Sequence, residues 1–313
     1  MLKYFTYALV LTSLLVNLGC SKDGSSDSSG PVYTGKSTAA IITNENGKEI
    51  VTGTLSSDDS DNLSKVFNAA NLETTQSEAF YKIAENIALT TKHLNESSSY
   101  FSAATETISG NCGGTAKINS SSETNVEITF SNFCDTDEFN TSGAKFSGKM
   151  SMSISGNDSR FQMSMALTNF SVVGKSNNVA VDMLMAGSMT MVVTSDETFS
   201  LTMTLVTQDN LTSQVSKSEN FKIFLSGGDT ITISGRMYDP EHGFVDLTTE
   251  SPIKLNSVGE ITSGELKATG LDSSATLAFE DDTFILSVDE DDDGTAESTE
   301  TGTLESLGIN SFV

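Results

Sequence analysis

Basic side chains are scarce in this sequence. Its 313 residues include 17 Lys and Arg against 42 Asp and Glu, which gives a formal net charge of −25. After Lys267 there is no Lys or Arg, whereas twelve Asp and Glu follow. Nucleic-acid binding requires clusters of basic residues that neutralise phosphates, and binding to anionic headgroups requires similar clusters. The composition therefore argues against a nucleic-acid partner and against electrostatic attachment to a membrane.

Histidine, the most common general acid or base in enzymes, is rare as well. His93 and His242 are the only two, so a Ser-His-acid triad would have to use one of them. His242 stands in YDPEHGF beside Asp239 and Glu241, which form either an acid–base cluster or a polar β-turn around Pro240. The sequence also lacks an H-E-x-x-H motif and a glycine-rich phosphate loop after a strand. We therefore predict that the protein is not an enzyme.

The N-terminus has the pattern of a signal peptide over residues 1–19. A single lysine precedes an apolar run over residues 4–18, which is too short to span a membrane as a helix. Gly19 and Cys20 follow, and a small residue directly before a cysteine resembles the lipobox of bacterial lipoproteins. Asn17 and Leu18 depart from that pattern, and an ordinary signal peptide cut near Gly19 is the alternative.

The lipobox resemblance implies that Cys20 becomes the N-terminus, carries acyl chains such as palmitate and anchors the protein to a membrane. Ser21 rather than Asp after the cysteine implies the outer membrane of a Gram-negative cell, facing either the periplasm or the surface. Residues 20–37 are rich in Ser and Gly, a composition typical of a flexible linker. We therefore expect a single domain over residues 38–313.

Only two cysteines remain once Cys20 is assigned to lipid. Cys112 and Cys134 form an even pair in an exported protein, which favours a disulfide. They bracket GGTAKINSSSETNVEITFSNF, which we expect to form a β-hairpin whose two ends meet. The sequence predicts a Cys112–Cys134 disulfide, with two free thiols as the alternative.

The first third of the chain is expected to contain a β-hairpin and the one strong helical pattern of the sequence. Residues 38–54 place Asn46-Gly47 between two β-capable runs, and Asn-Gly predicts a β-hairpin. A helical segment is expected over residues 62–108. Its apolar positions include a strict seven-residue spacing at Phe80, Ile87, Leu94, Phe101 and Ile108. Such a spacing predicts an amphipathic helix that packs on its own domain.

From residue 113 onward, apolar side chains alternate with Ser and Thr, as in Val126, Ile128 and Phe130. Clean alternation predicts antiparallel strands with one buried and one solvated face. Turn sequences such as SGNDSR and SGGDT join the runs, so consecutive strands should form a meander over residues 113–288. We predict an α+β, mainly β fold. A large curled antiparallel sheet would form a half-open barrel, or alternatively a sandwich, with the helical segment packed on its apolar face.

This architecture resembles the periplasmic lipoprotein-carrier fold and its lipid-binding relatives, without a shared motif. The stretches GRMYDPEHGFVDLTTESPI and GELKATGLDSSATLAF resemble the C-terminal part of uncharacterised proteobacterial β-rich lipoproteins. The flanks of the cysteine pair, GNCGG and FSNFC, fit the same group. The resemblance implies an exported lipoprotein and transfers no activity.

The stretch VDEDDDGTAESTETG has the spacing of a calcium loop over residues 289–300. Alternate acidic residues, a glycine at position 6 and an acid at position 12 bring oxygens together around one ion. Position 8 is Ala296 rather than a branched apolar residue, and the preceding TFILSV predicts a strand rather than a helix. We predict a structural Ca²⁺ site, with a solvated acidic turn as the alternative. The candidate ligands are Asp289, Asp291, Asp293, Thr295, Glu297 and Glu300.

Methionine is concentrated in the middle of the sheet region, although strands usually favour β-branched and aromatic residues. Met-x-Met pairs point to one face of a strand. Three interpretations are open. The methionines could simply fill the core under the helix, form an adaptable groove for a lipid-like apolar ligand, or bind Cu(I) through their thioethers. The absence of accompanying His or Cys argues against copper. The candidate face consists of Met150, Met152, Met163, Met165, Met183, Met185, Met189, Met191 and Met203.

Together these patterns predict a non-catalytic, membrane-anchored lipoprotein with a binding or structural role in the cell envelope. The alternative is a periplasmic carrier or binding protein that holds a lipid-like apolar molecule on the methionine-rich face.

Overall fold

The computed structural model describes residues 30–53 and 105–307, apart from residues 123, 135–143, 158, 177–178, 195–197, 228 and 257–259. It contains the short helix α2 (Gly47–Gly53) and the 3-10 helix η2 (Leu304–Leu307). The first seven strands are β1 (Thr105–Ser109), β2 (Gly113–Ser122), β3 (Asn125–Cys134), β4 (Lys145–Asn157), β5 (Arg160–Ser176), β6 (Val179–Thr194) and β7 (Phe199–Asp209). The other seven are β8 (Val215–Ser226), β9 (Thr230–Asp239), β10 (Gly243–Leu255), β11 (Ile261–Thr269), β12 (Ser274–Glu280), β13 (Thr283–Asp289) and β14 (Ser298–Thr303).

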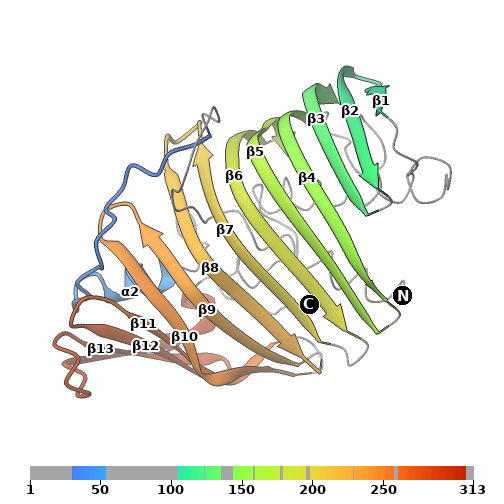
Figure 1. Ribbon diagram of the computed structural model, residues 1–313. Helices are drawn as coiled ribbons and strands as arrows, with labels where there is room; N and C mark the ends of the chain where they lie inside the picture. Colours follow the sequence, from blue (N-terminus) through green and yellow to red (C-terminus); the bar gives the residue numbers. More distant parts are fainter. Residues whose placement is uncertain are drawn as a thin grey trace.

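All 14 strands belong to one antiparallel sheet in which the order in space follows the order in the chain. Each strand pairs with the next, so β1 and β14 are the two edges of the sheet. The sheet curls into a trough (Figure 1). Right-handed strand twist makes such curling the expected outcome for a sheet of this width. The predicted mainly β, antiparallel meander is therefore confirmed. The sheet is single and open, so the half-open form is present rather than the sandwich.

Alternating side chains give this sheet two different faces. In β7, Leu201, Met203 and Leu205 are buried, whereas the intervening Ser and Thr residues are partly exposed. We call the face that carries the buried side chains the inner face and the opposite one the outer face. Inner-face residues from β2 to β13 form one continuous hydrophobic cluster. The two-residue period of the sequence therefore decides which side chains face the core.

Irregularities bend the longest strands. The pairing of β5 with β6 shifts register between Leu167 and Phe170, beside Gly187. Gly187 has a φ of 138°, and a Cβ atom there would lie 2.2 Å from the carbonyl oxygen of Thr204. Glycine is needed because any side chain would meet backbone of the neighbouring strand.

The β-hairpin predicted for residues 38–54 is wrong. Helix α2 begins at Gly47, and Asn46 precedes it in the position of a helix cap. The Thr43 N–H donates to Asn46 Oδ1 at 2.7 Å, and the Ile50 N–H donates to the Asn46 carbonyl at 2.8 Å. Asn is a preferred N-cap residue as well as a hairpin residue. Burial of Ile50 and Val51 in the core favours the helix.

The predicted helical segment 62–108 lies outside the described residues up to residue 104. Its last four residues, 105–108, are wrong as a helix, because they belong to β1. Ile108 pairs with Ala116 of β2 and packs against the hydrophobic cluster. Three of the five residues in TETIS are β-branched, which suits a strand.

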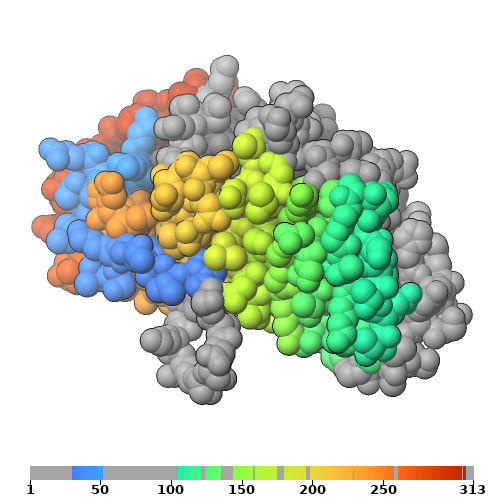
Figure 2. All heavy atoms as spheres, turned by 90° about the horizontal axis from the view of Figure 1, so that it is seen from above, coloured from blue at the N-terminus to red at the C-terminus, as the bar shows by residue number. Residues whose placement is uncertain are grey.

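The first described residues lie along the outer face of the sheet, where the dark-blue segment runs across the orange and yellow strands (Figure 2). The chain then enters the core, where Ala40 and Ile42 are fully buried. The Lys36 N–H donates to the Pro240 carbonyl at 3.0 Å, and Ala39 forms a parallel bridge with Phe244. The predicted linker over residues 20–37 is therefore packed on the sheet in its described part. Cys20 lies outside the described residues. Among the helices that the structure describes, none combines the length and hydrophobicity needed to cross a membrane.

Tyr33 attaches this N-terminal segment to the sheet. Its ring lies edge-on to Tyr238 at 5.4 Å between centroids, and its hydroxyl donates to the Asp239 carbonyl at 2.9 Å. Burial, and then the nearby Asp239 carboxylate, hold the pKa of the Tyr33 phenol well above its usual value. Lys217 contacts the Tyr238 ring from 4.0 Å and pairs with Glu219 at 2.7 Å. Partial burial lowers the pKa of Lys217, but the hydrogen bonds to Glu219 and Tyr238 outweigh it and raise the pKa overall.

Candidate functional site

An acidic cluster occupies the loop between β13 and β14. Asp289 is the last residue of β13, and Glu297 directly precedes β14. The backbone turns sharply between them, with φ of 54° at Asp292 and 89° at Gly294. One carboxylate oxygen from each of four residues lies within 4.8 Å of the others. These four residues are Asp289, Asp291, Asp293 and Glu297.

Backbone N–H groups hold the carboxylates of this cluster in place. Asp289 is only 8% exposed, and its two oxygens accept from Asp293 N–H at 3.2 Å and Gly294 N–H at 2.8 Å. Asp293 accepts from Thr295 N–H at 2.7 Å, and Glu297 accepts from Glu290 N–H at 2.6 Å. Oxygens bound to one Ca²⁺ ion at 2.3–2.6 Å lie at most about 5 Å apart. The cluster therefore has dimensions that could hold a metal ion.

Of the remaining two predicted ligands, Glu300 lies outside the cluster and Thr295 lies within the loop. Glu300 is on β14, opposite Leu286, and its carboxylate pairs with Lys48 Nζ at 2.6 Å. Thr295 belongs to the loop and donates its N–H to Asp293. The structure thus brings together four of the five carboxylates that the loop spacing indicated, and the regular β13–β14 pairing carries Glu300 away from them.

The chain before and within α2 ties the acidic loop to the rest of the protein. The Asn44 N–H donates to Glu290 Oε1 at 2.7 Å, and the Ser298 hydroxyl donates to the Asn44 side chain. On the other side, Lys267 lies 3.5 Å from Asp292. Sequence reasoning missed Asn44 and Lys48, which are more than 240 residues away along the chain and carry no local signal of the contact.

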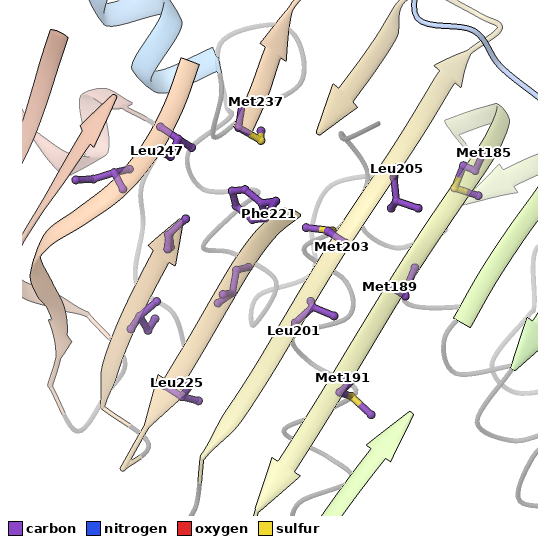
Figure 3. Packing of buried hydrophobic residues seen from close by; sticks show 14 of the residues in the cluster. Met185, Met189, Met191, Leu201, Met203, Leu205, Phe221, Leu225, Met237 and Leu247 are labelled. Carbon is purple, nitrogen blue, oxygen red and sulfur yellow. The ribbon is translucent and has the colours of Figure 1, made fainter. Parts of the chain in front are cut away.

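The predicted methionine face lies on the inner side of β4–β7. Side chains of Met185, Met189, Met191 and Met203 project from the same side of the sheet (Figure 3). Eight of the nine candidate methionines are buried, and Met163 is partly buried against the same cluster. Four of them form a continuous row across neighbouring strands. In order from β4 to β7, they are Met152, Met165, Met189 and Met203.

Two polar residues interrupt this inner face. Thr207 on β7 is 4% exposed and Ser218 on β8 is 0% exposed. Neither hydroxyl has a hydrogen-bond partner in the part of the chain that the structure describes. The sequence gives a faint signal for Thr207, which continues the alternation of Met203 and Leu205. Ser218 is out of phase with Phe221 and Ile223, and the register shift after Glu219 places it on the inner face.

The residues around His242 form a turn. Asp239 Oδ1 accepts from Glu241 N–H at 2.8 Å and from His242 N–H at 2.7 Å. This Asx-type turn joins β9 to β10. His242 Nε2 lies 3.6 Å from Glu49 of α2. Of the two interpretations of YDPEHGF, the geometry matches the polar turn, and His93 lies outside the described residues.

Comparison of the chain with protein-family models, curated proteins and solved structures finds no match.

Proposed function

We propose that this protein is a non-catalytic, membrane-anchored lipoprotein whose C-terminal sheet edge is stabilised by Ca²⁺ and whose role in the envelope is binding or structural. The four converging carboxylates of the β13–β14 loop carry the proposal. The signal-peptide pattern, the lipobox-like Gly19-Cys20 and the acidic composition support export and anchoring.

Electrostatics favour a divalent cation in this loop. The described chain around the cluster adds Glu290 and Asp292 to the four carboxylates, while Lys267 is 3.5 Å from Asp292. Like charges so close to one another repel in the folded state. A hard cation with oxygen ligands removes that repulsion, and Ca²⁺ tolerates the irregular geometry of a loop better than Mg²⁺ does. Because the loop also contacts Asn44, the bound ion would hold the chain before α2 against β13 and β14.

Calcium is expected to stabilise the protein by an amount that grows with the logarithm of its free concentration above the dissociation constant. At a free Ca²⁺ concentration 100 times the dissociation constant, the free energy of unfolding should rise by about 2.7 kcal/mol relative to EDTA. Urea unfolding with EDTA, Ca²⁺ or Mg²⁺ measures the difference. Asp291→Asn should abolish most of the gain, whereas Asp281→Asn, an exposed acid in the β12–β13 turn, should retain it. Identical unfolding curves in EDTA and Ca²⁺ would remove calcium from the proposal.

The anchor makes a separate prediction. Protein extracted from membranes should begin at Cys20 and carry the added mass of a diacylglyceryl group with acyl chains. Cys20→Ser should shift the protein from the membrane fraction to the soluble fraction, because two or more acyl chains are needed for stable anchoring. Intact-mass spectrometry of the extracted protein measures the start of the chain and the added acyl mass. An unmodified mature chain that begins at a residue other than Cys20 would contradict the prediction.

A carrier for an apolar ligand is the second candidate function. The observation in its favour is the methionine-lined inner face together with the two unpaired hydroxyls of Thr207 and Ser218. Methionine side chains adapt to irregular apolar shapes, which suits a surface that receives a flexible hydrocarbon chain.

A further inference from the structure

Thr207 and Ser218 lie where the sheet should carry apolar side chains. Thr207 is opposite Met185 of β6, and Ser218 is opposite both Leu205 of β7 and Met237 of β9. Opposite residues in antiparallel strands project to the same face. Both hydroxyls therefore point into the inner face, among side chains of the hydrophobic cluster.

Leaving these hydroxyls unpaired is unfavourable. A buried hydroxyl without a hydrogen bond destabilises a protein by about 1–3 kcal/mol, and the great majority of buried polar atoms have a partner. Valine and alanine have nearly the same shapes as threonine and serine and would avoid that penalty. Two orphan hydroxyls on neighbouring strands therefore point to a partner that binds there.

The geometry of the pair specifies how that partner is held. Thr207 pairs with Ser216, so Ser218 is its diagonal neighbour on the next strand. Diagonal neighbours have Cβ atoms about 7–8 Å apart or somewhat less, too far for a direct hydrogen bond between short side chains. One polar group between the two hydroxyls could reach both.

The charge of the surroundings specifies its chemistry. The buried polar and charged residues of the described chain are Thr207, Ser218, Ser273, Ser274 and Asp289, without a Lys or Arg. Lys217, next to Ser218, is paired with Glu219 and stacked on Tyr238 at the outer face. An anionic headgroup would therefore be buried without a counter-ion from the described residues, which is strongly unfavourable.

We propose that Thr207 and Ser218 form the polar anchor of a binding site for a neutral amphiphile, a long hydrocarbon chain that ends in a hydroxyl or ester group. The inference rests on the second candidate function, the carrier. The chain of the ligand would lie along the methionines of β4–β7, whose row from Met203 to Met152 crosses four strands. The hydroxyls would hold the ester or hydroxyl end between Met185, Leu205 and Met237.

Native mass spectrometry of the purified full-length mature protein tests this proposal with three probes: 1-monooleoylglycerol, oleate and octadecene. We expect the monooleoylglycerol complex to dominate. Thr207→Val with Ser218→Ala should lower its affinity about thirtyfold, the effect of losing two hydrogen bonds of ordinary strength, and leave octadecene binding unchanged. The matched control, Thr202→Val with Ser188→Ala on the outer face of β7 and β6, should bind like the unaltered protein.

The outcomes separate the anchor from the carrier function. If none of the probes binds, both are wrong. If monooleoylglycerol and octadecene bind equally well to the unaltered protein and to the Thr207→Val/Ser218→Ala variant, the carrier function stands and the anchor is wrong. The two hydroxyls would then hold only a buried water. A preference for oleate would overturn the neutral headgroup. The Thr207→Val/Ser218→Ala variant should unfold at the same urea concentration as the unaltered protein or at a higher one. Ser218→Ala alone repeats the ligand-binding test with a smaller structural change.

Discussion

Replacing Phe170 with alanine is expected to lower the free energy of unfolding by about 3–5 kcal/mol. Phe170 is only 1% exposed and lies on the inner face of β5, opposite Met185. Its ring contacts those of Phe130 and Phe146, with centroids at 5.7 Å and 6.2 Å. Alanine would remove these contacts and leave a cavity at a strand that is hydrogen-bonded on both sides, so the surroundings can collapse only in part.

Urea unfolding followed by circular dichroism measures this effect, with a common slope for both proteins as the sign that the unfolded states are equivalent. Val173→Ala is the matched control, because Val173 is on the same strand but 44% exposed. It should change the free energy of unfolding by no more than about 0.5 kcal/mol. A Phe170→Ala effect as small as that of the control would mean that the aromatic group does not pack on the inner face of this sheet.

The sheet was predictable because its physical basis is local. A strand exposes alternate residues to opposite sides, so the alternation of β7 or β13 identifies the core face without knowledge of the partners. Short polar turns imply that neighbouring strands in sequence are neighbours in space, which the strand order confirms throughout. Closure was not predictable in this way. Whether a curled sheet stays open depends on twist summed over all strands and on bulges such as the one between Leu167 and Phe170 of β5.

The mistakes occurred where one residue type serves two local structures. Asn46-Gly47 fits a hairpin turn and a helix start equally well, and burial of Ile50 and Val51 decided for α2. Ile108 fits the end of a seven-residue repeat as well as an edge strand, and pairing with Ala116 decided for β1. In both cases the deciding interaction is with residues outside the segment whose pattern was interpreted.

The acidic loop shows the same division between local and distant information. The spacing of Asp289, Asp291 and Asp293 indicated their convergence, because alternate residues and a glycine fold back within one tight turn. The position of Glu300 was set by β14, a strand that the sequence pattern did not reveal and that continues the meander beyond the acidic loop. The Glu300 carboxylate, which the loop spacing had assigned to the ion, forms a salt bridge with Lys48.

Removing the disulfide should destabilise the first edge of the sheet. Cys112 and Cys134 are bonded as predicted, with Cα atoms 5.1 Å apart and 22 positions apart in the chain. They join the start of β2 to the end of β3, where Gly113 lies opposite Cys134. Closing a loop of this length restricts the unfolded chain and contributes about 3 kcal/mol to the free energy of unfolding.

Changing both cysteines to serine should therefore lower the free energy of unfolding by about 3 kcal/mol, measured by urea unfolding without reductant. Dithiothreitol should shift the unmodified protein to the same midpoint and leave the double variant unchanged, which separates loss of the bond from any effect of the serine side chains. Since β1 is only five residues long and pairs on one side with β2, the constraint acts on the part of the sheet with the fewest neighbouring strands. Amide hydrogen exchange in the double variant should accordingly rise most in β1–β3, and equal exchange there and in β11–β13 would show that the bond does not stabilise this edge.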